Sequence, residues 1–385
     1  MAAQKLPVEL LGRIIGFMES TTSARLICQL WNILAIPRAF RTITLKPTGR
    51  SYKGWGALTE NVRVENAVHE VLIYSHDPAE ETDFMNRVPP EFTMALQKIH
   101  ELQYLEKITV RFSPRCFGPE SIQSELCEHE WYKKRVNVFE LVFNAIQTRS
   151  HLTRRTRIRS FRVENMQNAP LFTFTSSNVF NSVIKDLEEV HLHVIQEYDE
   201  IDRQHNAFTQ LERVTFEPWL QENWLMPMAN NLRSLSLCFA DNWGTAPGTF
   251  NGRGLAFPHL KSLHLRCFII SHYDHFDWVL NQTILETLRL EDCSIATVLR
   301  FGEGMDLWGP DTHDWEPIPE GTFGNDWGEI FFFSGTWEFI FDNIRARLSG
   351  LVAFEFLPES RDIDGLNSST EQITALYETR YTVRA

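Results

Sequence analysis

Cysteine is scarce in this sequence, which has six cysteines among 385 residues. No two of them stand in a C-x-x-C pair, the spacing that is typical of zinc sites and redox-active thiols. Their number is also far too low for a small secreted scaffold held together by disulfides. We therefore expect a protein of a reducing compartment, the cytoplasm or the nucleus, without a cysteine-based metal centre.

Long apolar runs are missing as well. Even the stretch from Leu26 to Ile36 is interrupted by Gln29 and Asn32, and it falls short of the roughly 18 residues that a membrane span needs. Glu9 and Arg13 interrupt the place where the apolar region of a secretory signal would lie. The sequence thus predicts no membrane association and no secretion signal.

Lysine and arginine are outnumbered by acidic residues, 37 to 50, and the net charge is −13. A protein that coats nucleic acid needs a surplus of cations to displace counterions from phosphates, so we exclude that class. The hydrophobic fraction of 43% and the charged fraction of 23% are close to ordinary globular values. At roughly 150 residues per domain, the length allows two or three folded units.

Known catalytic motifs are absent from the sequence, which has no nucleophile elbow, P-loop, dinucleotide-binding glycine motif or H-E-x-x-H helix. His191 and His193 alternate as ligands on one strand face would, but no cysteine or second histidine pair near them in the sequence completes a zinc site. The turn from Asp362 to Gly365 lacks the other ligands of a calcium loop. We expect a non-catalytic protein without cofactor or metal. A hydrolase or transferase with an unusual site is the rival hypothesis.

Two amphipathic helical patterns stand near the amino terminus. The first opens at Leu6, reaches about Met18 and has an apolar arc of roughly 180°, wider than the ~100° stripe that one core needs. The second runs from Leu26 to Leu34, spans roughly 160° and is stopped by Pro37. Each helix therefore has an apolar face left over, which requires either a protein partner or the following domain of the same chain.

The same segment resembles the F-box motif. The residues that carry the resemblance are Leu6-Pro7-Val8-Glu9-Leu10-Leu11, Ile14, Ile27-Cys28-Gln29-Leu30-Trp31, Leu34-Ala35 and Pro37 to Phe40. Leu30 departs from the motif, which often has a basic residue after its cysteine. The resemblance implies a three-helix unit over residues 1–45 that binds a Skp adaptor and, through it, a cullin and a RING protein. It also implies that these residues face or support the adaptor: Leu6, Pro7, Leu10, Ile14, Ile27, Cys28, Trp31 and Leu34.

Residues 46–60 are polar and contain three glycines, which predicts a linker. A repeat follows, in which leucine comes first, a charged residue second and apolar residues fourth and sixth. Its five copies begin at Leu187, Leu211, Leu232, Leu260 and Leu285, and looser copies begin at Val68, Leu105, Ile158 and Leu351. The spacing of the five copies lies within or near the 20–29 residues of leucine-rich repeats.

This pattern resembles an irregular leucine-rich-repeat domain over residues 61–360, with helical patterns between the strands at 138–146 and 337–348. The resemblance implies an α+β protein whose larger part is an α/β solenoid of horseshoe shape, placed after the F-box. The alternative is that the strands belong to an ordinary α/β sheet. Residues 361–385 are expected to form a C-terminal tail with a short helix.

In each repeat, positions five and seven point away from the buried positions four and six, and so they cover the concave face of the predicted solenoid. The face comprises Arg162, Glu164, His191, His193, Thr215, Glu217, Ser236, Cys238, His264, Arg266, Arg289, Glu291, Glu355 and Leu357. Its cations suit an acidic or phosphorylated peptide of a protein substrate. The predicted substrate-binding residues are Arg162, His191, His193, His264, Arg266 and Arg289. An ordinary solvated face is the alternative.

A long insertion, residues 302–337, separates the last clear repeat from Leu351. It holds eight acidic residues, no lysine or arginine, and four tryptophans. The insertion is too long for a simple connection, and tryptophan is common at interface hot spots. We therefore predict a recognition arm or lid that uses Trp308, Trp315 and Trp327. A packed cap is the alternative.

These features predict the substrate-recognition subunit of a Skp-cullin-F-box ubiquitin ligase. Such a subunit holds a substrate close to the ubiquitin-charged enzyme and does no bond chemistry itself. The alternative is an F-box protein that acts outside the ligase, in a structural or trafficking role. Ubiquitination of a captured partner separates the two.

Overall fold

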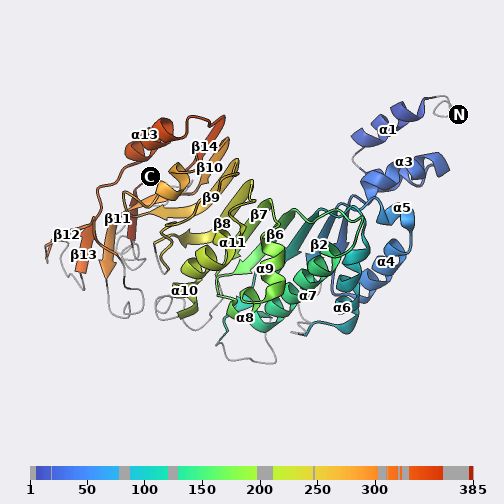
Figure 1. The fold of residues 1–385 in the computed structure, drawn as a ribbon, viewed down its shortest axis with the longest axis horizontal. Helices are drawn as coiled ribbons and strands as arrows, with labels where there is room; N and C mark the ends of the chain where they lie inside the picture. The colour runs from blue at the N-terminus through green and yellow to red at the C-terminus, as the bar shows by residue number, and fades with distance from the viewer. Residues whose placement is uncertain are drawn as a thin grey trace, which may run out of the picture. The chain divides into compact units, whose positions relative to one another are not determined.

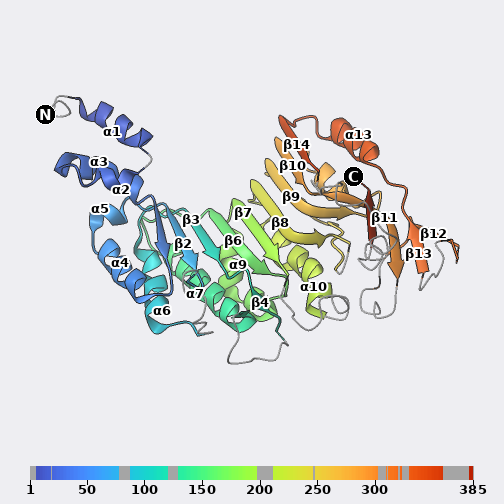
Figure 2. The ribbon, with the colours of Figure 1, turned by 180° about the vertical axis from the view of Figure 1, so that it is seen from behind.

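The computed structural model describes residues 6–18, 20–77, 87–119, 129–196, 211–245, 248–301, 309, 311–319, 321–322, 329–358 and 381–384. They form a mixed α/β fold with a large, mostly parallel sheet (Figure 1; Figure 2 shows the reverse side). The chain divides into two compact units. Unit 1 comprises Met1–Arg115, Ile122–Glu164 and Ser177–Val183, and unit 2 comprises Cys116–Ser121, Asn165–Ser176 and Ile184–Ala385. Among the described residues, no helix is long and apolar enough to cross a membrane.

Three helices open unit 1: α1 (Val8–Phe17), α2 (Thr21–Ala24) and α3 (Gln29–Ala39). The Ser20 hydroxyl accepts a hydrogen bond from the Ser23 amide and so caps α2. Pro37 lies in the last turn of α3 rather than after it. The helices share a small core that consists of Ile15, Ala24 and Ala35, with Met18, Trp31 and Leu34 packed against it.

The segment predicted as a linker contains a helix instead. Helix α4 (Gly49–Thr59) lies within it, and α5 (Val62–Glu65) follows. Trp55 is buried, and Leu58 packs against the cluster of Ile36, Val64 and Ala67. Residues 46–60 are therefore not an extended linker, because two apolar side chains at helical spacing outweigh the three glycines.

Four parallel strands of unit 1 pair in the order β1 (Thr42–Leu45), β2 (Glu70–Tyr74), β3 (Lys107–Arg111) and β6 (Ser160–Gln167). Helix α7 (Tyr132–Ser150) covers one face of this sheet, where Phe143 lies edge-on against Phe161 of β6. The helical pattern predicted at 138–146 lies within α7. The other elements of unit 1 are α6 (Pro90–Gln97), the 3-10 helix η2 (Lys98–Glu101), β5 (Glu130–Trp131) and α9 (Asn178–Ile184).

Unit 2 has parallel strands in the order β7 (Glu189–Ile195), β8 (Ser234–Trp243), β9 (Ser262–Ile270), β10 (Thr287–Glu291) and β14 (Ala353–Leu357). Strand β11 (Ser294–Phe301) pairs with the end of β9 and with the antiparallel strands β13 (Glu329–Phe332) and β15 (Tyr381–Arg384). Strand β12 (Glu316–Pro317) pairs with β13. The other elements of unit 2 are β4 (Cys116–Phe117), α8 (Phe172–Thr175), α10 (Leu211–Leu220), the π-helical turn η3 (Gln221–Leu225), α11 (Met226–Met228), α12 (Asp277–Leu280) and α13 (Trp337–Arg347).

Eight of the nine predicted repeat copies contain a strand, and each strand begins two residues after the first residue of its copy. The leading residues are Val68, Leu105, Ile158, Leu187, Leu232, Leu260, Leu285 and Leu351. All of them except Leu351 are buried. The strands of unit 2 then pair in register, so that equivalent positions of successive copies lie side by side, and the register of β8 and β9 shifts only between Cys238 and Trp243.

The ninth copy, Leu211 to Phe216, was predicted as a strand, and this prediction is wrong because the segment belongs to α10. Leu211 is exposed, whereas the buried apolar residues from Phe216 onward have helical spacing along α10, η3 and α11. They are Phe216, Trp219, Leu220, Trp224, Leu225 and Met228. A helical stripe of this length outweighs six residues of alternating pattern. Thr215 and Glu217 therefore lie on a helix and not on the sheet.

Two predictions fall partly outside the described residues. In the insertion, residues 302–308 and 323–328 lie outside them, and these stretches include Trp308 and Trp327. In the predicted C-terminal tail, residues 361–380 also lie outside, and Tyr381–Arg384 forms β15.

Candidate functional site

The first candidate site is the exposed apolar surface of α1, α2, α3 and the residues beside them, which we call the apolar helix face. Its members are Leu6, Val8, Leu10, Ile14, Phe17, Leu26, Ile27, Leu30 and Ile33. Each is at least 40% exposed, and Phe17 and Leu26 are 89% and 87% exposed. Isolated apolar side chains on a surface are common, but this many within one short segment indicate a binding surface.

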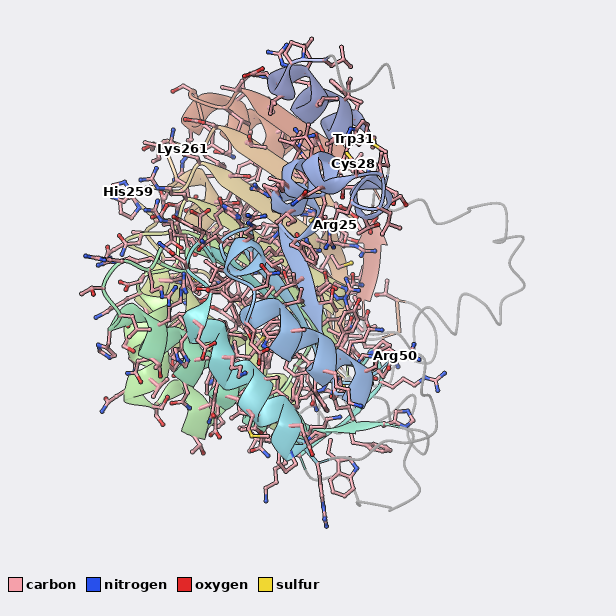
Figure 3. All side chains as sticks on the ribbon, turned by 90° about the vertical axis from the view of Figure 1, so that its right-hand side faces the viewer. Arg25, Cys28, Trp31, Arg50, His259 and Lys261 are labelled. Carbon is pink, nitrogen blue, oxygen red and sulfur yellow. The ribbon has the colours of Figure 1, made fainter. Side chains whose placement is uncertain are left out.

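The residues predicted to meet the adaptor divide into two groups. Trp31 and Leu34 pack against the small core of the three helices and thus have a supporting position. The others are exposed: Leu6, Pro7, Leu10, Ile14, Ile27 and Cys28. Figure 3 labels Cys28 and Trp31 at this end of unit 1. The alternative that the following domain covers both helix faces does not describe these exposed side chains.

Arg25, which Figure 3 labels, connects the end of α2 to α3. Its Nε donates a hydrogen bond to Asn32 Oδ1 at 3.0 Å, and its guanidinium lies 4.4 Å from the centre of the Phe40 ring. The exposed side chains of Leu26 and Ile27 follow Arg25 directly in the chain. A surface whose backbone is held in this way loses less conformational entropy when a partner binds.

The second candidate site is a polar network on the open face of the unit 2 sheet, which we call the polar ladder. Its members are Ser236, Cys238, His264, Arg266, Arg289, Glu291, Asp292 and Glu355. The register places His264 Nδ1 3.2 Å from Ser236 Oγ, and His264 Nε2 3.1 Å from Glu291 Oε2. Arg289 donates to Glu291 Oε2 at 2.7 Å and to Glu355 Oε2 at 3.3 Å.

The arginines of the polar ladder are paired with carboxylates. Arg266 Nε lies 3.2 Å from Asp292 Oδ2 and 3.5 Å from Glu291 Oε1. Burial alone would raise the pKa of Glu291, but the hydrogen bond and charge of Arg289 outweigh it and lower that pKa. Burial lowers the pKa of His264, and the charge of Glu291 offsets this decrease only in part. The two arginines thus face three carboxylates, and the ladder has no surplus of positive charge for an acidic or phosphorylated peptide.

Of the other predicted substrate-binding residues, His191 and His193 lie on β7 beside the polar ladder, and Arg162 lies apart from it. His191 stands beside Ser236 in the strand register, and the Asn165 amide donates to His193 Nδ1 at 3.4 Å. Arg162 belongs to unit 1, where its Nε lies 3.1 Å from Glu164 Oε1. The structure therefore brings together His264, Arg266 and Arg289 in one network, with His191 in the same row.

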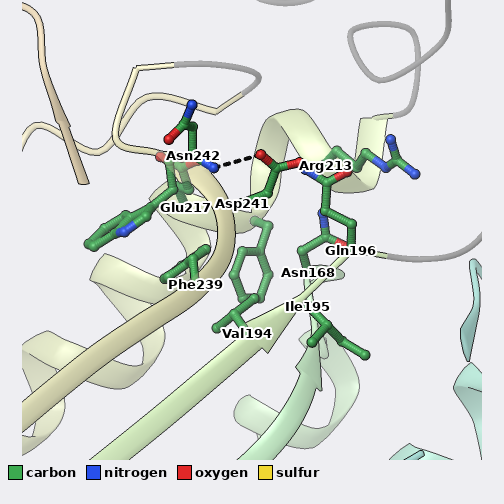
Figure 4. A pocket seen from close by; sticks show the side chains of 11 residues that line it. Asn168, Val194, Ile195, Gln196, Arg213, Glu217, Phe239, Asp241 and Asn242 are labelled. Atoms are coloured by element: carbon green, nitrogen blue, oxygen red, sulfur yellow. Dashed lines mark hydrogen bonds between the residues drawn. The ribbon is translucent and has the colours of Figure 1, made fainter. Parts of the chain in front are cut away.

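A small pocket lies in unit 2 between α10 and the ends of β7 and β8 (Figure 4). Glu217 of α10 lines it together with Phe239 and Trp243, whose rings stack at 4.3 Å. Glu217 Oε2 accepts a hydrogen bond from the Gly244 amide at 2.9 Å, and burial raises the pKa of Glu217 to about 8. The repeat pattern predicts Glu217 on the sheet face, and this prediction is wrong because the residue belongs to α10. The helical spacing of residues 216–228 was the signal that could have located it.

Trp315 of the insertion is buried rather than offered to a partner. Its ring stacks on Phe333 at 5.5 Å and meets His272 edge-on at 6.2 Å. Only 6% of its surface is exposed. For this tryptophan, the packed-cap alternative describes the structure and the recognition arm does not.

No protein-family model matches this sequence, and a search of curated proteins finds no significant match. The resemblance to F-box and leucine-rich-repeat proteins therefore rests on the residues quoted above.

Proposed function

We propose that this protein is the substrate receptor of a Skp-cullin-F-box ubiquitin ligase. In this proposal α1, α2 and α3 form the F-box, and they bind the Skp adaptor through the apolar helix face. The parallel strands form a leucine-rich-repeat-like domain that binds a protein substrate. The observation that carries the proposal is the set of nine exposed apolar side chains in the segment that resembles the F-box, four of which (Leu6, Leu10, Ile14 and Ile27) are positions that the resemblance assigns to the adaptor.

The size of the apolar helix face is adequate for a durable complex. Burying about six of its side chains yields roughly 9–18 kcal/mol, at ~1.5–3 kcal/mol each. Association opposes this gain with roughly 4–15 kcal/mol of lost freedom. The small core of Ile15, Ala24 and Ala35 gives the three helices little of their own to bury, which is consistent with helices that complete their packing on a partner.

The repeat domain is proposed to select the substrate through the polar ladder. The ladder presents donors and acceptors already fixed by mutual hydrogen bonds, so a ligand with both kinds of group fits it better than a purely anionic one. Ubiquitin transfer then depends on proximity, because tethering raises the effective concentration of substrate lysines near the charged enzyme. The chain itself contributes binding and no covalent step.

The adaptor test uses charge substitutions on the most exposed members of the apolar helix face. Phe17→Asp and Leu26→Asp should abolish co-purification of the full chain with a Skp adaptor, because each buries a carboxylate in an apolar interface. Val62→Asp is the matched control, since Val62 of α5 is also exposed but lies outside the face. Unchanged adaptor binding in both variants, with circular dichroism like that of the original chain, would refute the F-box assignment.

The ligase test follows adaptor binding. The complex is assembled with cullin and RING protein, and the partners captured by the full chain are identified by mass spectrometry while ligase activity is blocked. Restoring activity should ubiquitinate at least one of those partners, and Leu26→Asp should prevent it. Adaptor binding without any ubiquitinated partner would favour a role outside the ligase.

A further inference from the structure

Two segments of unit 2, residues 271–275 and 311–315, bring together imidazole and carboxylate groups from distant parts of the sequence. The rings of His272 and His313 stack with centroids 5.1 Å apart and an interplanar angle of 11°. His272 Nδ1 lies 2.5 Å from Asp314 Oδ1, and His313 Nε2 lies 4.0 Å from Asp314 Oδ2. One potential ligand atom from each residue can be chosen so that all lie within 4.8 Å of one another.

Two further hydrogen bonds orient these groups. His313 Nδ1 lies 3.0 Å from Asp311 Oδ1, and because a carboxylate only accepts, Nδ1 carries a proton and the lone pair of the neutral ring is on Nε2. The Tyr273 amide donates to Asp314 Oδ2 at 2.9 Å and fixes that carboxylate. A carboxylate on the far nitrogen of a histidine is the usual support of metal-binding imidazoles. The arrangement is thus more specific than a patch of acidic side chains.

His275, in the same loop, has a structural role instead. It is buried, and burial lowers its pKa to about 4. Its Nδ1 accepts from the Ser271 amide at 3.2 Å, and its Nε2 donates to the Phe250 carbonyl. Both ring nitrogens are used by the backbone, so His275 has no lone pair for a ligand. His313, by contrast, directs Nε2 away from its supporting carboxylate.

We propose that His272, His313 and Asp314 bind a divalent transition metal of the zinc class, with Asp311 supporting His313. Two imidazole nitrogens and one carboxylate oxygen suit Zn²⁺, whereas Mg²⁺ and Ca²⁺ prefer oxygen ligands alone. The metal takes the place of the hydrogen bond between His272 Nδ1 and Asp314, and the neutral His272 ring then carries its one proton on Nε2 so that the Nδ1 lone pair faces the ion. The three ligand atoms then draw together around the ion, and water fills the fourth position.

The consequence of such a site is mechanical. It joins the segment 311–315 of the acidic insertion to the loop that follows β9, beside the packed rings of Trp315 and Phe333. A metal that binds only this folded arrangement stabilises it by mass action. This inference does not depend on the proposed ligase function.

The test uses the full chain after removal of metals with a chelator. Titration with Co²⁺ should give the visible absorption of a tetrahedral centre at one ion per chain, and Zn²⁺ should displace it and raise the melting temperature. His313→Ala is the principal variant because His313 is half-exposed, and it should weaken Zn²⁺ binding more than about 100-fold. Asp311→Asn should weaken it about 10–100-fold.

The matched control is His259→Ala, which removes an exposed histidine of unit 2 outside the cluster (Figure 3) and should leave binding unchanged. Equal Zn²⁺ affinity of the original chain and His313→Ala would overturn the proposal. So would Co²⁺ binding without saturation, or an equal loss in His259→Ala. A melting temperature of metal-free His313→Ala close to that of the original chain excludes misfolding as the cause of lost binding.

Discussion

The helices α1 to α3 and the interior of unit 2 depart from the usual distribution of side chains in opposite directions. In the helices, nine large apolar side chains are exposed, and the buried apolar residues are Leu11, Ile15, Ala24, Ala35 and Ile36. In unit 2, polar side chains such as Glu217, Gln221 and Gln282 are buried. Each of the three accepts a hydrogen bond from a backbone amide of a connecting loop.

The two departures have different physical reasons. A buried polar side chain is stable when a fixed backbone group satisfies it, and the loops of unit 2 supply such groups. An exposed apolar side chain has no such remedy within its own chain, and only a partner removes it from water. Glu217, Gln221 and Gln282 are thus satisfied within unit 2, whereas the exposed apolar side chains of the helices stay in contact with water.

The largest effect is expected from two consecutive leucines of α1 that differ in burial. Leu11 is buried and Leu10 is 44% exposed. Leu11→Ala should lower the free energy of unfolding of the three helices by about 2–5 kcal/mol, because it leaves a cavity. Leu10→Ala should change it by less than about 0.5 kcal/mol and weaken adaptor binding roughly tenfold. Chemical denaturation followed by circular dichroism, and adaptor titration, measure the two effects. Equal losses of stability would mean that α1 has no exposed face in solution.

A pH-dependent effect is expected from Glu217. Its folded pKa of about 8 exceeds the ordinary value, so the folded chain holds one more proton than the unfolded chain between roughly pH 4.5 and 8. The contribution of Glu217 to the free energy of unfolding is therefore complete below this window. It falls by about 1.4 kcal/mol per pH unit as the pH rises through the window. Glu217→Gln keeps an acceptor for the Gly244 amide and should remove this slope.

Unfolding measured by urea titration across the window tests the role of Glu217. Glu212→Gln, in the first turn of the same helix, is the control and should retain the slope of the original chain. A slope that persists in Glu217→Gln would show that another group binds the proton.

The smallest effect is expected in the polar ladder. Burial lowers the pKa of His264, and the charge of Glu291 opposes it. Glu291→Gln should therefore lower the pKa of His264 further, while Glu355→Gln, which removes only a partner of Arg289, should leave it nearly unchanged. Proton NMR of the His264 ring during a pH titration measures both. A shift of equal size in the two variants would show that the ladder is not connected as described.

The positions of the strands were largely predictable from the sequence. The leading residues of the repeat, such as Leu187 and Leu260, are buried just before the strands. The spacing of apolar residues predicts this burial directly. The exposed apolar side of the first helix was also predictable, and Leu10 and Ile14 lie on it. Only short-range periodicity is needed for such inferences.

The sequence predictions failed where two local patterns compete or where the residues in contact are far apart in the sequence. At Leu211 a strand pattern and a longer helical pattern overlap, and the helix prevails through residues that follow it. At Trp55 one buried aromatic side chain outweighs a glycine-bearing composition. The cluster of His272 and Asp314 joins segments forty-two residues apart, which no local pattern reveals. The pairing of Arg266 with Asp292 likewise depends on which strands are neighbours.

The shared register of the unit 2 strands limits which sequence changes the face of the sheet tolerates. Because neighbours align residue for residue, a whole copy inserted between two strands would lengthen every row by one side chain and leave the existing rows in order. A single residue inserted within a strand would instead turn the buried side chains of that strand outward. Variation in such a protein is thus expected by substitution within rows or by gain of complete copies, and seldom by small insertions in the strands.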